Sequence, residues 1–214
     1  MYSPAHFDET RLEVLSELIR AQPLATFVTQ CPQGLNADHI PLQWHSEPAP
    51  FGTLRGHVAR ANPLWREADR TTDVLAVFSG PQAYITPAWY ATKAETGRVV
   101  PTWNYIAVHA SGRLNVIDDP RWLRQQIEAL TAQQEAGLAV PWQVDDAPND
   151  YIDTLLRNIV GIEIIVTKLL GKWKVSQNQP AKNRAGVVHG LAASAASDSQ
   201  AMAACVAERG KQSQ

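Results

Sequence analysis

The sequence lacks the features that mark secreted and membrane proteins. Among 214 residues there are two cysteines, Cys31 and Cys205, far apart and outside any CxxC pair, so no disulfide or zinc framework is expected. The start, MYSPAHFDE, has no basic residues followed by an apolar run, as a signal peptide would. No segment approaches the roughly 20 apolar residues of a membrane span. We therefore expect a cytoplasmic protein with no membrane segment.

An excess of positive charge is also missing. The chain has 19 basic and 21 acidic residues, a net charge of −2. Proteins that grip nucleic acid through its phosphates usually carry a basic excess or a basic stripe. No helix-turn-helix pattern is visible either. Direct DNA binding is therefore doubtful, although a small basic patch on a dimer would escape this count. The histidines show no HxxxH or HxH pairing, so no metal site is predicted.

Short strand-like segments follow one another along most of the chain. Segments rich in β-branched and aromatic residues predict strands at 24–30, 36–45, 53–59, 73–78, 82–86, 99–110, 112–117 and 161–169. After the Gly80-Pro81 break, residues 82–86 either continue the strand at 73–78 or start another, and Ser111-Gly112 is expected to form a hairpin turn. Asn62-Pro63 and Asp119-Pro120 are expected to begin helices. Consecutive strands favour a β-barrel with peripheral helices over a parallel sheet.

The segment GHVARANP, residues 56–63, carries polar residues at a predicted strand-to-helix junction. Free N–H groups and the positive end of the dipole at a helix N-terminus suit an anion. The guanidinium of Arg60 would add a fork that matches phosphate oxygens. His57, Arg60 and Asn62 are therefore candidates for binding a phosphate. A purely structural interpretation also fits, with Asn62 capping the helix and Arg60 lying at the surface.

Two further segments carry aromatic and polar residues that a flat heterocycle would need. Trp103, Asn104 and Tyr105 could flank and hydrogen-bond a ring, although aromatic residues in strands more often fill a core. Lys172 and Lys174 alternate with Trp173, so on a strand both lysines point the same way. They would form either a small phosphate-facing patch or a solvated strand face.

Together these motifs resemble the PaiB family, a branch of the FMN-binding split-barrel proteins. The resemblance is carried by GHVARANP at 56–63, VPTWNY at 100–105 and GKWKVSQN at 171–178, in that order. It extends over about residues 1–191, and it implies a single antiparallel, Greek-key-like split-barrel domain with peripheral helices there. Residues 192–214, rich in Ala and Ser, would be a C-terminal helix or tail.

The resemblance also implies a function. The chain would be a homodimer that binds FMN across its interface and acts as a negative transcriptional regulator. Carried over motif by motif, the site residues are His57, Arg60 and Asn62 on the phosphate side, Thr102, Trp103 and Asn104 on the ring side or interface, and Lys174, Ser176, Gln177 and Asn178 nearby. Two alternatives stay open, a flavin-dependent oxidoreductase of the split-barrel class and a haem-binding relative. Whether the protein is an enzyme is not decided by the sequence.

Overall fold

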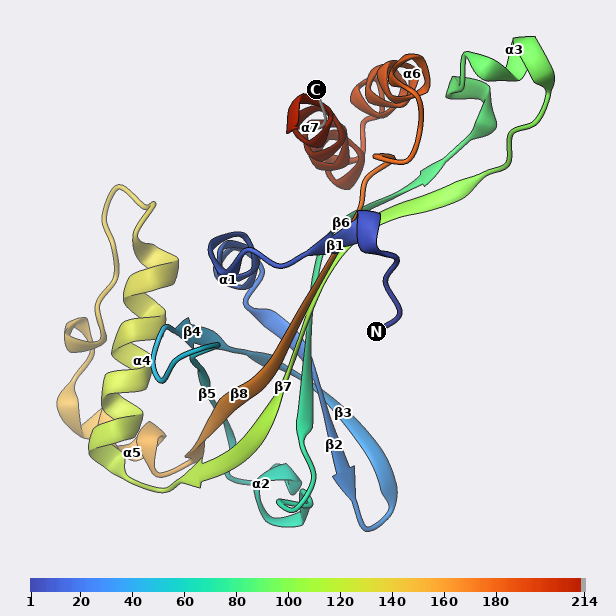
Figure 1. The fold of residues 1–214 in the computed structure, drawn as a ribbon. Helices are drawn as coiled ribbons and strands as arrows, with labels where there is room; N and C mark the ends of the chain where they lie inside the picture. The colour runs from blue at the N-terminus through green and yellow to red at the C-terminus, as the bar shows by residue number, and fades with distance from the viewer. Residues whose placement is uncertain (213–214) are drawn as a thin grey trace. The chain divides into compact units, whose positions relative to one another are not determined.

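The computed structural model of the protein describes residues 1–212. These residues form two compact units, and each is described by itself. The barrel unit comprises residues 19–78 and 109–169, and the helical unit comprises residues 1–18, 79–108 and 170 onward. Three long strands run through both units, namely β6 (Val74–Ile85), β7 (Thr102–Ile117) and β8 (Ile159–Lys174) (Figure 1).

The sheet is antiparallel and does not close on itself through hydrogen bonds. Its strand order is β3-β2-β6-β7-β8-β5-β4, so β3 and β4 are the ends of the path. The remaining strands of the barrel unit are β2 (Leu24–Cys31), β3 (Gly34–Pro41), β4 (Gln43–His45) and β5 (Thr53–Ala59). Strand β2 pairs antiparallel with β3 and β6, and β5 pairs antiparallel with β4 and β8. The predicted antiparallel split barrel is confirmed.

The interior of the barrel unit is built from alternating side chains. Phe27 on β2 is buried, and on β5 Leu54, Gly56 and Val58 are buried while Arg55 and His57 between them are less so. Gly56 lies where the end of β3 comes close to β5 without forming a ladder with it. A Cβ at Gly56 would lie 2.7 Å from the Pro41 carbonyl oxygen, so only glycine permits this approach.

Three helices belong to the barrel unit: α2 (Leu64–Glu67), α4 (Pro120–Glu135) and α5 (Asn149–Leu156). The Asp119 side chain accepts a hydrogen bond from the Arg121 N–H at 2.8 Å, so it caps α4 as the sequence predicts. Leu123 of α4 packs in a buried cluster with Ile152 and Leu156 of α5. This second, smaller core attaches the helix pair to its own unit.

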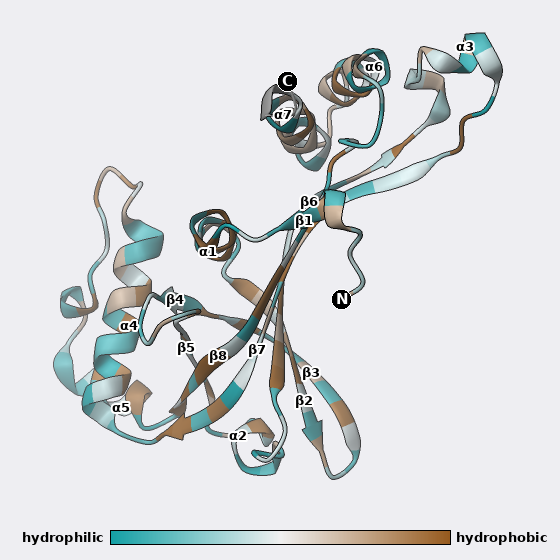
Figure 2. Cartoon of the chain, viewed as in Figure 1, coloured by the Kyte–Doolittle hydropathy of each residue, from teal (hydrophilic) through white to brown (hydrophobic). Residues whose placement is uncertain are grey.

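The helical unit has a separate core. Its helices include α6 (Ala181–Ala192), α7 (Ser197–Gln212) and the short α3 (Thr92–Thr96). Helix α1 (Leu12–Ala21) has residues in both units. The short strand β1 (Asp8–Glu9) pairs with β8. Val187 and Leu191 of α6 and Met202 and Val206 of α7 are buried together, and Figure 2 shows apolar residues on both helices. The Ala/Ser-rich segment therefore contains a packed helix, α7, while the domain boundary at 191 stays a prediction.

The hairpin turn predicted at Ser111-Gly112 is wrong, and residues 82–85 continue the strand that includes 74–78, the first of the two alternatives at that place. Strand β6 continues through Gly80-Pro81, and β7 continues through Ser111-Gly112, where a hairpin turn was expected. A Cβ on Gly112 would collide with the Ile165 carbonyl oxygen. This glycine is thus needed for close strand packing, which a sequence pattern cannot distinguish from a turn.

Candidate functional site

Two sequence motifs meet in the helical unit. Lys174, at the end of β8, donates a hydrogen bond from Nζ to Thr102 Oγ1 at 2.6 Å, where β7 begins. The Asn104 Nδ2 donates to Ser176 Oγ at 2.8 Å. We call Thr102, Asn104, Lys174 and Ser176 the amide–lysine cluster. It joins residues 72 positions apart, all of them predicted site residues.

The Asn104 amide in this cluster is only half satisfied. The residue is 1 % exposed, and its Oδ1 is buried with no hydrogen-bond partner among the described residues. An acceptor left in this state costs about 1–3 kcal/mol, and natural proteins rarely leave one without a reason. A ligand that presents an N–H or O–H group would complete the Asn104 side chain. The cluster therefore fits a flat heterocycle with a ring N–H, as a flavin has.

The Lys174 ammonium in the same cluster has no counter-anion. Thr102 Oγ1 is its one hydrogen-bond acceptor within residues 1–212, and no carboxylate in that range forms an ion pair with it. Burial lowers the pKa of Lys174, and Lys172 lowers it further, while Tyr105 acts in the opposite direction. A partly desolvated cation of this kind favours an electron-rich ligand atom beside it.

The chain turns sharply just after Lys174. Ser176 has φ of 61°, the one positive φ at a non-glycine residue in the described chain, and it is 3 % exposed. The Gln177 side chain holds this turn, because its Oε1 accepts from the Val175 N–H at 2.8 Å and its Nε2 donates to the Trp173 carbonyl. Strained backbone of this kind is concentrated at functional sites. Gln177 thus positions Ser176, and Asn178 beyond it is exposed.

Trp103 lies on the opposite face of β7 from Thr102 and Asn104. It is 54 % exposed and makes an edge-to-face contact with Tyr84 of β6, which is 49 % exposed, with ring centroids 6.1 Å apart. The interpretation of Trp103 as a core residue is therefore excluded for the isolated chain. The two rings form an exposed aromatic pair, which is typical of an interface.

The barrel unit holds the other predicted residues, and two of them line a pocket. His57 and Asn62 lie with Asp38 and His39 around a pocket of about 360 Å³. Asn62 Nδ2 donates to Asp38 Oδ1 at 2.9 Å. Its Oδ1 accepts from the Leu64 N–H at 2.8 Å, so Asn62 already satisfies the start of α2, a helix of only four residues. The carboxylate of Asp38 works against an anion in this pocket.

Arg60 has partners of its own within the barrel unit. Its guanidinium donates to both carboxylate oxygens of Asp118, at 2.9 and 2.5 Å, and to the carbonyls of Arg157 and Ile159. This pairing lowers the pKa of Asp118. The positive charge that sequence reasoning assigned to a phosphate is therefore balanced by a carboxylate in the free chain. The phosphate-side roles of His57, Arg60 and Asn62 stay predictions.

Sequence reasoning did not find Gln126 of α4. Its Oε1 lies 2.7 Å from His57 Nδ1, and its own Nε2 is buried with no partner among the described residues. A glutamine in the middle of an amphipathic helix gives no signal of such a role. The contact spans 69 positions of sequence, which pattern reading does not reach.

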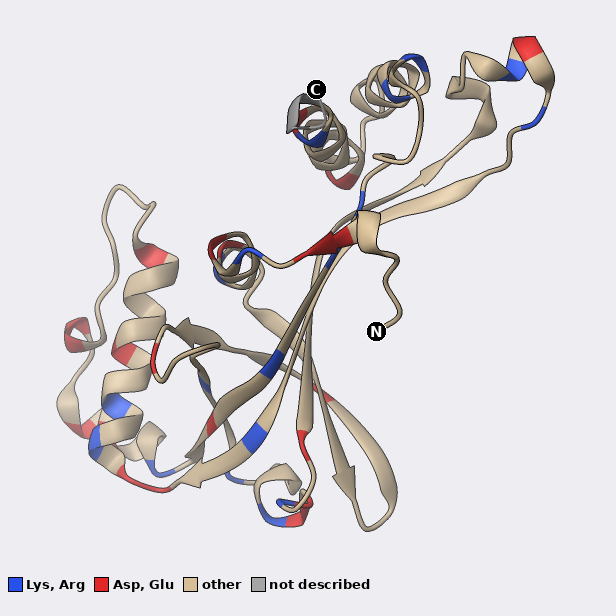
Figure 3. Ribbon diagram, in the orientation of Figure 1, with Lys and Arg blue, Asp and Glu red and all other residues tan. Residues whose placement is uncertain are grey.

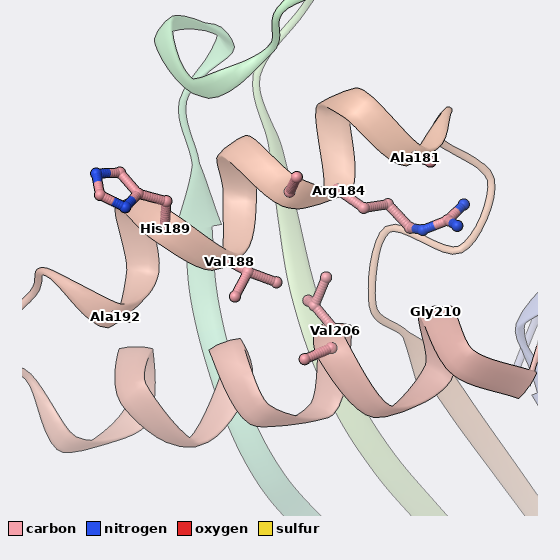
Figure 4. Close-up of a pocket in the computed structure, with 9 residues that line it drawn as sticks. Ala181, Arg184, Val188, His189, Ala192, Val206 and Gly210 are labelled. Carbon is pink, nitrogen blue, oxygen red and sulfur yellow. The ribbon is translucent and has the colours of Figure 1, made fainter.

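A separate groove lies between α6 and α7 (Figure 4). Its volume is about 570 Å³, and small or apolar residues line it together with Arg184 and His189. Val188 and Val206 face each other across it (Figure 4). None of the predicted site residues lines this groove, so it is distinct from the amide–lysine cluster.

Charged residues and potential metal ligands are spread along the described residues. Figure 3 shows Lys and Arg interspersed with Asp and Glu along the barrel unit, without a purely basic stretch in its described residues. Residues 1–212 contain no group of three or more His, Cys, Asp or Glu placed to hold a metal ion. No helix in that part of the chain is both long and apolar enough to cross a membrane.

Known proteins resemble this chain in sequence and in fold. Residues 1–168 match the family described as "Putative FMN-binding domain". The "Uncharacterized protein AN0679" of Emericella nidulans is 35 % identical over 246 aligned residues, which cover 99 % of this chain and 98 % of the relative. The "Protease synthase and sporulation protein PAI 2" of Bacillus subtilis is 30 % identical, with 89 % of each chain covered. The solved structure of the FAD and haem binding protein of Mycobacterium smegmatis matches with a TM-score of 0.57 at 15 % sequence identity. The match covers 78 % of this chain and 73 % of the Mycobacterium chain, and it shows a similarity of fold alone.

Proposed function

Since the chain belongs to this family of FMN-binding domains, we propose that it is a flavoprotein of the PaiB type with FMN as its cofactor. The observation that carries the proposal is the buried Asn104 Oδ1, which has no hydrogen-bond partner within residues 1–212. It belongs to one cluster with the Lys174 ammonium, which forms no ion pair with a carboxylate in that range. From the sequence, Asn104 was expected on the ring side or interface, and Lys174 near the site. When bound, FMN would supply redox chemistry, and these residues would orient it.

The proposal gives separate roles to two sets of residues, one in each unit. Thr102, Asn104, Lys174 and Ser176 would hold the ring, and Gln177 would keep their turn in place. His57, Arg60 and Asn62 would bind the phosphate. To do so, Arg60 would either release the Asp118 carboxylate or contact both anions at once. We further propose a homodimer in the cytoplasm, with Trp103 and Asn178 at or near the interface. The exposed pair of Trp103 and Tyr84 supports an interface there.

In the cell the protein would act as a negative regulator of transcription, through a partner protein rather than through DNA. The net charge of −2 and the mixing of basic and acidic residues along the barrel unit (Figure 3) favour the indirect route. Binding to DNA fragments should stay undetected below micromolar concentration over a series of salt concentrations. Tight binding with a steep salt dependence would contradict it. A flavin-dependent oxidoreductase is the second candidate, because a lysine beside the ring suits a flavin that accepts electrons.

A titration of the purified protein with FMN, followed by flavin fluorescence, tests the cofactor. We expect binding, with Asn104→Ala weakening it by about tenfold, since a lost buried hydrogen bond costs about 1–3 kcal/mol. Asn183→Ala is the matched control, because Asn183 is buried in the same unit and its amide is fully partnered by Thr92 and Gln179. No binding of FMN by the wild type would refute the proposal. A haem band in the visible spectrum would select the haem-binding alternative.

The phosphate assignment has its own test. Arg60→Ala should weaken FMN by about 1.5–3 kcal/mol and leave riboflavin, which has no phosphate, unchanged. Asp118→Ala frees the guanidinium and should strengthen FMN or leave it unchanged. Equal losses in both variants would show that the Arg60–Asp118 pair only supports the fold.

A further inference from the structure

We propose that Asn104 and Lys174 recognise the pyrimidine edge of the flavin ring, and that the site therefore binds reduced FMN more tightly than oxidised FMN. The inference rests on the proposed function and deepens it. The amide–lysine cluster would bind the ring end of the ligand, and it would bind the reduced form more tightly.

The Asn104 side chain favours the ring end of the ligand over the phosphate end. One N–H of its Nδ2 is donated to Ser176 Oγ, and the buried Oδ1 has no partner within residues 1–212. A phosphate offers oxygen acceptors, which would repel this carbonyl oxygen. The pyrimidine edge of a flavin instead offers one N–H, at N3, between two carbonyl groups. That N–H is the donor that Oδ1 lacks, and it fixes the edge of the ring at this position.

The Lys174 ammonium favours binding of the reduced flavin over the oxidised flavin. Thr102 and Asn104 are two positions apart on β7 and so share a face, and Lys174 Nζ is bonded to Thr102, so we expect the ammonium to face the same ligand edge. FMN that has gained two electrons and one proton carries a negative charge over N1 and the C2 carbonyl oxygen. The oxidised ring is neutral there. An ammonium without a carboxylate partner attracts the anionic edge more strongly, and a partly buried site screens this attraction less than water does.

The first experiment distinguishes the two ends of the ligand. Lys174→Gln removes the charge and still can donate to Thr102 Oγ1. We expect it to weaken riboflavin and FMN by the same factor, about threefold to tenfold for the oxidised forms. Lys182→Gln is the charge-matched control, because this exposed lysine pairs with Glu95 at 2.5 Å, and it should change neither affinity. A loss seen with FMN but not with riboflavin would place the phosphate at Lys174 and overturn the inference.

The second experiment measures the redox preference. Affinities are determined for oxidised FMN and, under nitrogen, for FMN reduced with dithionite. The wild type should bind the reduced form more tightly. Lys174→Gln should reduce that preference by about tenfold, which corresponds to a midpoint potential about 30 mV more negative. Lys182→Gln should keep the wild-type preference, and an unchanged preference in Lys174→Gln would overturn the inference.

The third experiment addresses Asn104. Flavin methylated at N3 cannot donate at that position, so the wild type should bind it about tenfold more weakly than FMN. Asn104→Ala should bind both ligands equally. Equal discrimination in the wild type and the variant would show that Asn104 does not read N3. A wild type that binds neither FMN nor riboflavin refutes the proposed function itself, whereas binding without these discriminations refutes only this inference. Lys174→Met serves in place of Lys174→Gln if the unfolding midpoint of the latter shows that it is unfolded.

Discussion

Replacing Glu9 with Gln perturbs a buried carboxylate that connects the first strand of the chain to its last helix. Glu9 in β1 is 4 % exposed. Its carboxylate accepts from Arg11 Nε at 2.9 Å and Arg11 Nη2 at 2.6 Å, and from Arg209 Nη1 of α7 at 2.9 Å. The backbone N–H groups of Thr10 and Arg11 also donate to it. These donors, led by the Arg11 side chain, outweigh burial and lower the pKa of Glu9 from 4.5 to about 2.

The size of this pKa change gives the expected loss of stability. A change of one pKa unit corresponds to 1.36 kcal/mol, so the fall from 4.5 to about 2 is worth about 3 kcal/mol of folding free energy. The folded-state pKa is depressed, so this contribution is complete at pH above 4.5 and is lost as the pH falls toward 2. Glu9→Gln should therefore lower the free energy of unfolding by about 3 kcal/mol at pH 7 and by well under 1 kcal/mol at pH 2.

Urea unfolding followed by tryptophan fluorescence, repeated from pH 7 to pH 2, measures both effects. Glu17→Gln, which neutralises an exposed carboxylate of α1, is the control and should change stability by less than about 0.5 kcal/mol at every pH. A Glu9→Gln effect that stays constant between pH 5 and pH 2 would refute the reasoning. It would show that packing of the side chain, and not its charge, stabilises this part of the fold.

Other substitutions test the packing and the proposed assembly. Gly112→Ala should destabilise the protein by about 1–3 kcal/mol in urea unfolding, because its Cβ meets the Ile165 carbonyl, whereas Gly137→Ala, with open space around it, should be close to neutral. Met202→Ala should lower the free energy of unfolding by about 2–5 kcal/mol in the same measurement, since Met202 is fully buried in the core of the helical unit. A loss below about 1 kcal/mol would mean that α7 is not part of that core. Trp103→Glu should raise the dimer dissociation constant at least tenfold in sedimentation velocity; an unchanged constant would place the dimer interface elsewhere.

The sequence was sufficient where local chemistry determines structure. The Asp119-Pro120 pair begins α4, and the order of strand-like segments favours the antiparallel barrel that is observed. The motifs around Asn104 and Lys174 also turned out to share one cluster, although only the family resemblance had linked them.

The sequence was insufficient where distant residues decide. Gly112 resembles a turn residue until the Ile165 carbonyl is placed against it. Arg60 looks free for an anion until Asp118, 58 positions away, is found bound to it. The partner of a side chain depends on strand pairing, and the pattern of one strand contains no record of its neighbour.

The unclosed order of the sheet has a consequence for how copies of this protein meet at high concentration. Strand β3 ends the sheet path and is eight residues long, with most of its residues exposed. A terminal strand of that length can template the addition of a strand from another molecule, which leads to aggregates. Asp38, in the middle of β3 and held by Asn36 and Asn62, puts a fixed negative charge where such a strand would have to dock. We expect the carboxylate to oppose such pairing at the same place where it lines the pocket.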